Sequence, residues 1–144
     1  MNPKNPWQSY RRVATNTASP GQLVLMLYEG AIRFLERAQA GFQLEDPVEF
    51  NTTINDNILR AQDIIRELDF SLNVDKGGEL ANQLRRLYDY FDRLLLESNL
   101  RKDPAGITEV ISRITVLRDA WAQMLSQQGD STDTQRLTAE LAAN

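Results

Sequence analysis

The stretch TASPGQLVLMLYEGAIRFL, residues 17–35, combines a helix start with an unusual density of apolar side chains. Ser19 is a good N-cap, Pro20 fits the first helical position because its missing N–H would have no partner there, and Gln22 can complete a capping box. The six residues from Leu23 to Tyr28 are all apolar or aromatic. A surface helix needs an apolar stripe only a little wider than about 100°. The stretch therefore predicts a helix with more apolar surface than one neighbour covers.

Length and composition narrow the class of protein. A chain of 144 residues, 42% of them hydrophobic, is typical of one domain with a real core. It has no Cys and no His, which excludes disulfides, thiol nucleophiles, thiolate or imidazole metal sites and the usual general base near neutral pH. The net charge is −4, with acidic and basic residues interspersed, so neither nucleic-acid binding nor a polybasic membrane surface is predicted.

The sequence contains no segment that predicts membrane insertion or secretion. No apolar run approaches the roughly 18 residues that a membrane span requires. The first residues, MNPKNPWQSYRRVATN, lack the apolar centre of a secretory signal. We therefore expect a cytoplasmic protein.

Proline marks a helix start three times, at Pro20, Pro47 and Pro104, and each follows a Ser or Asp that can act as N-cap. The pair Gly77-Gly78 predicts a turn that divides the long middle stretch into two helices. Each segment has apolar residues at alternating steps of three and four, which places them on one helical face. These seam positions are Val24, Tyr28, Ala31, Leu35, Ala38 and Phe42; Ile54, Ile58, Ala61, Ile65, Leu68 and Leu72; Leu80, Leu84, Leu87, Phe91 and Leu94; and Ile107, Val110, Ile114, Leu117, Trp121 and Met124. Because the connections are short, we expect an all-α, antiparallel up-down-up-down four-helix bundle.

We expect the bundle to span residues 19–129. Gly129 fits the position just after the fourth helix. Beyond it, residues 130–144 are polar, with only Leu137 and Leu141 as spaced apolar positions. This composition predicts a mobile C-terminal tail with at most a short helix.

Residues 1–18 have a different pattern. Trp7, Tyr10 and Val13 lie at three-residue steps among polar side chains. Aromatic residues in such a segment need an apolar surface to lie on. We expect a short N-terminal capping segment anchored by these three side chains, and either a permanent cap or a lid that opens for a partner fits the pattern.

Apolar residues beside the seam are numerous. Some fill out the core, because helices in compact domains use three or four apolar positions per two turns. Taken together they exceed what four helices can hide from water, and contiguous exposed apolar patches usually mark a partner site. We therefore expect an amphipathic segment of another protein to cover part of this surface. The candidate partner-binding residues are Tyr10, Leu25, Ile32, Leu59, Ile64, Leu95 and Leu96.

The motifs of catalysis and metal binding do not occur. Di-iron bundles need Glu-x-x-His pairs, and the aspartates of the second helix are spaced as a solvated face rather than as a calcium loop. Gly77-Gly78 has no following Lys-Ser or Lys-Thr that would indicate a phosphate-binding loop. We predict no catalytic residue, cofactor or metal. Two alternatives to a binding module stay open: a small all-α enzyme that holds an anionic substrate through arginines such as Arg85-Arg86, and a structural helical subunit.

Three stretches and one tyrosine resemble the flagellin-specific export chaperones of bacteria, the FliS family. They are Tyr10, TASPGQLVLMLYEGAIRFLERA, ELDFSLNVDKGGELANQLRRLYDYF and VISRITVLRDAW, and they follow in the same order and with similar spacing up to Trp121. The resemblance implies a cytoplasmic four-helix bundle that binds the C-terminal segment of newly made flagellin, which is disordered in the monomer. It also implies that the chaperone prevents premature polymerisation and delivers flagellin to the flagellar type III export gate. Whether an anti-sigma factor or co-chaperone is a further partner stays open.

Overall fold

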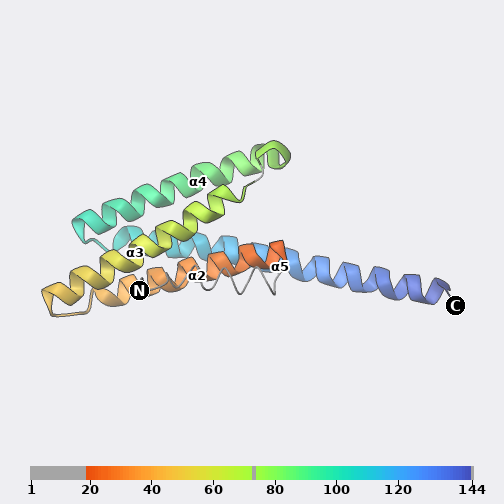
Figure 1. Cartoon of the computed structure of the whole chain (residues 1–144), viewed down its shortest axis with the longest axis horizontal. Helices are drawn as coiled ribbons and strands as arrows, with labels where there is room; N and C mark the ends of the chain where they lie inside the picture. The colour runs from red at the N-terminus through yellow and green to blue at the C-terminus, as the bar shows by residue number, and fades with distance from the viewer. Residues whose placement is uncertain (1–18, 73, 144) are drawn as a thin grey trace, which may run out of the picture.

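The structure is a computed structural model that describes residues 19–72 and 74–143. In these ranges the chain forms four α-helices and no strand. Helix α2 spans Pro20–Gly41, α3 spans Pro47–Phe70, α4 spans Val74–Arg101 and α5 spans Ala105–Ala143. The prediction of an all-α helical bundle is therefore confirmed (Figure 1).

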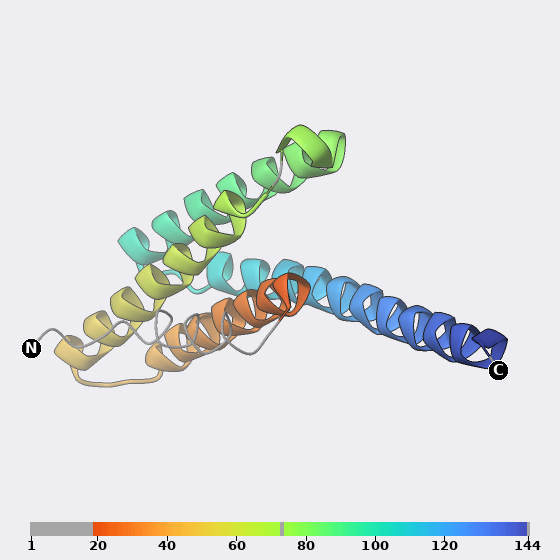
Figure 2. The same cartoon turned by 45° about the vertical axis from the view of Figure 1, so that its right-hand side comes forward.

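Each helix packs against two others. Helix α2 contacts α3 and α5, and α4 likewise contacts α3 and α5. In Figure 1, and in the turned view of Figure 2, α3 and α4 rise together away from α2 and α5. The two pairs are close where α2 ends and α3 begins, and they diverge toward the start of α2 and the end of α3. The bundle thus has a closed end and an open end.

The predicted helix starts have the expected hydrogen bonds. The hydroxyl of Ser19 accepts from the backbone N–H of Gln22, and the amide oxygen of Gln22 accepts from the backbone N–H of Ser19, both at 3.2 Å. At α3 the carboxylate of Asp46 accepts from a backbone N–H of the first turn at 2.8 Å. Asp103 does the same for α5 at 3.0 Å. These caps give the unpaired N–H groups of each helix a partner.

The second and third helices divide earlier than the predicted turn at Gly77-Gly78, since α3 ends at Phe70 and α4 begins at Val74, and the glycine pair makes a break inside α4. Gly78 has φ 56° and ψ −132°, which is not a helical conformation. A glycine adopts a positive φ without the steric cost that a side chain would add. The break at Gly78 separates a first turn from the long part of α4 that packs in the bundle.

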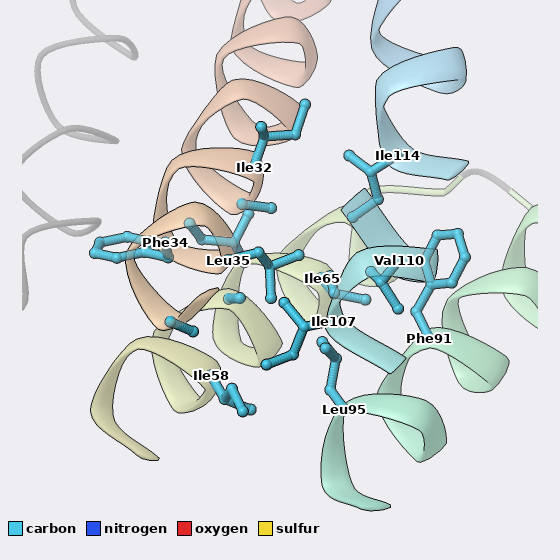
Figure 3. Packing of buried hydrophobic residues seen from close by; sticks show 14 of the residues in the cluster. Ile32, Phe34, Leu35, Ile58, Ile65, Phe91, Leu95, Ile107, Val110 and Ile114 are labelled. Carbon is cyan, nitrogen blue, oxygen red and sulfur yellow. The ribbon is translucent and has the colours of Figure 1, made fainter. Parts of the chain in front are cut away.

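The core fills the closed end of the bundle. Figure 3 shows Leu35 of α2, Leu95 of α4 and Ile107 of α5 pointing toward a common centre, and all three are completely buried. The largest fully buried side chains are Phe91, Leu35, Ile54, Ile58, Ile64, Ile65, Leu68, Leu95, Ile107, Ile114 and Val110. Burial of one such side chain stabilises a fold by about 1.5–3 kcal/mol.

The fourth helix does not end where the sequence indicated. Helix α5 continues through Gly129 to Ala143, so the predicted helix end at Gly129 is wrong. A glycine inside a helix costs about 1 kcal/mol relative to alanine, which by itself is too little to end a helix. Figure 1 shows this last part of α5 projecting beyond the other three helices.

Candidate partner-binding groove

An apolar groove of about 340 Å³ opens where the two helix pairs diverge. Its lining residues come from all four helices and from the chain just after α3: Val24, Tyr28, Leu68, Ser71, Leu72, Gly77, Leu80, Ala81, Leu84, Tyr88 and Trp121. None of these residues carries a charge. The volume lies in the range of about 300–1,000 Å³ that is common for ligand sites. Shape and lining therefore suit an apolar, uncharged group.

The walls of the groove are mostly predicted seam positions. Val24, Leu72, Leu84 and Trp121 pack against the core but stay partly exposed. Leu80, also a predicted seam residue, is 64% exposed. Because the helices diverge here, no facing helix among residues 19–72 and 74–143 covers these side chains. The predicted surplus of apolar surface exists, but it consists of the seam positions at the open end of the bundle.

A pair of tyrosines from opposite sides meets in the groove. The hydroxyl oxygens of Tyr28 on α2 and Tyr88 on α4 are 2.6 Å apart, and both side chains are buried. Burial raises the pKa of both tyrosines above the usual value, because a phenolate would lose its hydration there. At Tyr88 the neighbouring hydroxyl of Tyr28 and the charge of Asp69 raise the pKa further. Both hydroxyls are therefore neutral at physiological pH and act as hydrogen-bonding groups.

The other polar side chains of the groove bond to backbone carbonyls. The indole N–H of Trp121 donates to the carbonyl oxygen of Gly21 at 2.7 Å, which ties α5 to the start of α2. The hydroxyl of Ser71 donates to the carbonyl oxygen of Leu68, also at 2.7 Å. Both groups thus hold elements of the groove in place and have no donor left for a ligand.

Three of the predicted partner-binding residues belong to the core. Ile32, Ile64 and Leu95 are 6%, 1% and 0% exposed. The expectation that they lie outside the core is wrong, because in this bundle the positions beside the seam also fill the space between helices. A partner cannot reach them while the fold stays intact.

The other described candidates are accessible. Leu59 on α3 and Leu96 on α4 are 47% and 51% exposed. Asn55 and Asn99 lie one turn away from these leucines on the same helices, and the side-chain amide of Asn99 donates to that of Asn55 at 2.9 Å. The two leucines therefore lie along the edges where α3 and α4 face each other. We call Leu59 and Leu96 the α3–α4 patch. Leu25 is partly exposed.

The predicted anchors Trp7, Tyr10 and Val13 lie outside the described residues, so the cap or lid and the role of Tyr10 stay predictions.

Several groove residues were not among the predicted binding residues. Leu72, Leu80, Leu84 and Trp121 were assigned to the core by their spacing alone. One signal could have indicated the groove, namely tyrosines on facing helices near the same end of the seam, since a buried hydroxyl needs a hydrogen-bond partner.

The described residues give no support to an anionic-substrate site or a metal site. Arg85 pairs with Asp69 at 3.3 Å and Arg86 with Glu79 at 3.2 Å, and neither arginine lines the groove. Among the described residues no group of acidic side chains could hold a metal ion. In the same ranges no helix has the length and apolar character needed to cross a bilayer.

Comparison with known proteins identifies a family. The family model described as "Flagellar protein FliS" matches residues 3–128. The chain is 36% identical over 125 residues to the flagellar secretion chaperone FliS of Bacillus subtilis, which covers 87% of this chain and 90% of the relative. It is 38% identical over 112 residues to the protein of the same name from Salmonella typhimurium, covering 77% and 80%. The protein of that name from Vibrio cholerae is 32% identical over 122 residues, covering 81% and 86%.

Proposed function

We propose that this chain, which belongs to the FliS family of flagellar secretion chaperones, binds the C-terminal segment of flagellin. By holding that segment in the cytoplasm, it prevents premature polymerisation and delivers flagellin to the flagellar type III secretion apparatus. The family consists of chaperones rather than enzymes, so the alternative of a small helical enzyme is set aside. The observation that carries the proposal is the apolar groove at the open end of the bundle.

The groove suits an amphipathic segment for a simple energetic reason. An apolar side chain that enters it leaves water and contacts Leu72, Leu80 and Leu84, which are themselves incompletely buried. Each large apolar side chain buried in this way contributes about 1.5–3 kcal/mol. Recognition of an amphipathic helix in an apolar groove is an established mode of peptide binding. The charge-free lining also means that no buried ion pair has to form.

We propose the α3–α4 patch and Leu25 as contacts outside the groove. The two leucines of the patch are half-exposed, so a polar replacement there leaves the core untouched. A flagellin segment longer than the groove would reach them by wrapping around the bundle. Leu59→Ser and Leu96→Ser are then expected to weaken binding while the free energy of unfolding changes little.

Residues 1–18 are proposed to act as a lid, with Trp7, Tyr10 and Val13 as anchors. A segment on a short tether acts at an effective concentration of order mM, so a weak lid can cover apolar surface until flagellin displaces it. Removal of residues up to Arg12 should increase the binding of the dye ANS to the free protein. Hydrogen exchange that protects this segment equally with and without saturating peptide would contradict the lid.

The proposed function is tested by calorimetry with a synthetic peptide of the C-terminal segment of flagellin from the same organism. We expect a 1:1 complex. Leu80→Ala removes part of a groove wall and should weaken binding by about 1–2 kcal/mol, or about 5- to 30-fold. Val48→Ala is the control, because Val48, in the first turn of α3, is 72% exposed and does not line the groove. Failure to form a complex, or equal loss in both variants, would contradict the proposal.

A further inference from the structure

The side-chain donors of the groove can be counted. Four lining residues have a polar side chain: Tyr28, Ser71, Tyr88 and Trp121. Ser71 and Trp121 each have a single N–H or O–H group, and each donates it to a backbone carbonyl at 2.7 Å. The two tyrosines together have two O–H groups, and a single hydrogen bond of 2.6 Å between their oxygens uses one of them.

One tyrosine O–H is therefore left over. Whichever hydroxyl accepts in the bond between Tyr28 and Tyr88 still has its own proton to donate. Within the part of the chain that the structure describes, neither tyrosine has another acceptor. Both tyrosines line the groove, although each is only 3% exposed, so a docked segment would lie against the pair.

We propose that the Tyr28–Tyr88 pair donates one hydrogen bond to a main-chain carbonyl oxygen of the docked segment, and so selects a segment with a carbonyl free at that point. The inference rests on the proposed function and names a determinant of specificity within the same groove.

The chemistry of the groove favours a backbone carbonyl over other acceptors. A carboxylate would have to enter a lining that offers no opposite charge, which is costly away from water. A carbonyl oxygen is neutral and accompanies every apolar side chain that enters. Inside a helix the carbonyls are already bonded, and only the last four of a helix are unpaired. The docked segment should therefore place a helix C-terminus or a non-helical residue over the tyrosine pair.

The test compares Tyr28→Phe/Tyr88→Phe with the wild type. Replacing both hydroxyls leaves no unpaired buried hydroxyl, and such a paired replacement can be nearly neutral for stability. Binding of the flagellin C-terminal peptide should weaken about 5- to 150-fold, because the carbonyl loses its donor in a desolvated site. Tyr90→Phe is the matched control: Tyr90 is also on α4, but its hydroxyl donates to Glu109 and it does not line the groove. It should bind as the wild type does.

An ester scan of the peptide separates a hydrogen bond from a packing effect. In each peptide of the scan one amide is replaced by an ester, which makes the carbonyl a weaker acceptor. One position should weaken binding to the wild type and to Tyr90→Phe but have no effect on the double Phe variant. The inference is overturned if the double variant binds as tightly as the wild type, or if every ester has the same effect on both proteins. Failure of the unmodified peptide to bind the wild type would instead overturn the proposed function.

Discussion

Replacing Phe91 by Ala is expected to destabilise the fold by about 3–5 kcal/mol. Phe91 is 0% exposed, and its ring centre lies 6.3 Å from that of Tyr88 and 6.4 Å from that of Tyr90. The substitution removes the transfer free energy of the ring and leaves a cavity that the neighbours fill only in part. It also removes two aromatic contacts, which contribute about 0.5–1.5 kcal/mol each in comparable pairs. The loss should therefore fall in the upper part of the range.

The cost is measured by urea unfolding followed by circular dichroism. A loss of 3–5 kcal/mol is a large share of the roughly 5–15 kcal/mol that stabilises a typical domain. In a thermal melt it corresponds to a fall in Tm of about 6–20 °C for a chain of this size. Phe70→Ala is the matched control, because Phe70 is 88% exposed and its removal should change the free energy of unfolding by less than about 0.5 kcal/mol. Equal effects of the two substitutions would refute the placement of the core.

Three further predictions concern other parts of the molecule. Gly106→Ala should destabilise the fold by about 1–3 kcal/mol in the same urea assay, because the added Cβ would lie 2.9 Å from the backbone oxygen of Leu94; an unchanged midpoint would contradict this. Since the pKa values of Tyr28 and Tyr88 are raised in the fold, their contribution to stability is fully present below the unfolded pKa of about 10 and is lost as the pH rises above it, by up to about 1.4 kcal/mol per pH unit for each tyrosine. The free energy of unfolding, measured at pH 8, 10 and 11, should fall less steeply with pH in Tyr28→Phe/Tyr88→Phe than in the wild type. Truncation after Gly129 should lower Tm far less than Phe91→Ala does, because the removed part of α5 projects beyond the other helices.

The helices could be predicted because their signals are local. A cap such as Ser19 with Gln22, or a break such as Gly78, acts through atoms a few residues away and is the same in any fold. The steps of three and four give the buried face of each helix, and Leu35 and Ile107 lie in the core as predicted. The prediction failed at Gly129, because one glycine costs only about 1 kcal/mol inside a helix and does not by itself specify where the helix ends.

The groove could not be predicted in the same way, because it depends on the angle between helix pairs. Leu35 and Leu84 occupy equivalent positions in the apolar repeat, yet Leu35 is fully buried and Leu84 lines a groove. The difference arises because α3 and α4 diverge from α2 and α5 at one end, and no local pattern specifies that divergence.

Under the proposed function, partner binding in the groove would bury apolar side chains in the same way as folding does. Leu68 is 1% exposed and belongs to the core, and it also lines the groove, so core and site share a side chain. A docked segment would occupy the place that a facing helix has at the closed end. The pattern that specifies a core then also specifies the groove, whereas Ile32 and Ile64, which lie beside the seam, are buried by the bundle itself. That pattern does not specify the polar chemistry of the groove, where the tyrosine pair supplies the one side-chain donor that the described groove residues do not use themselves.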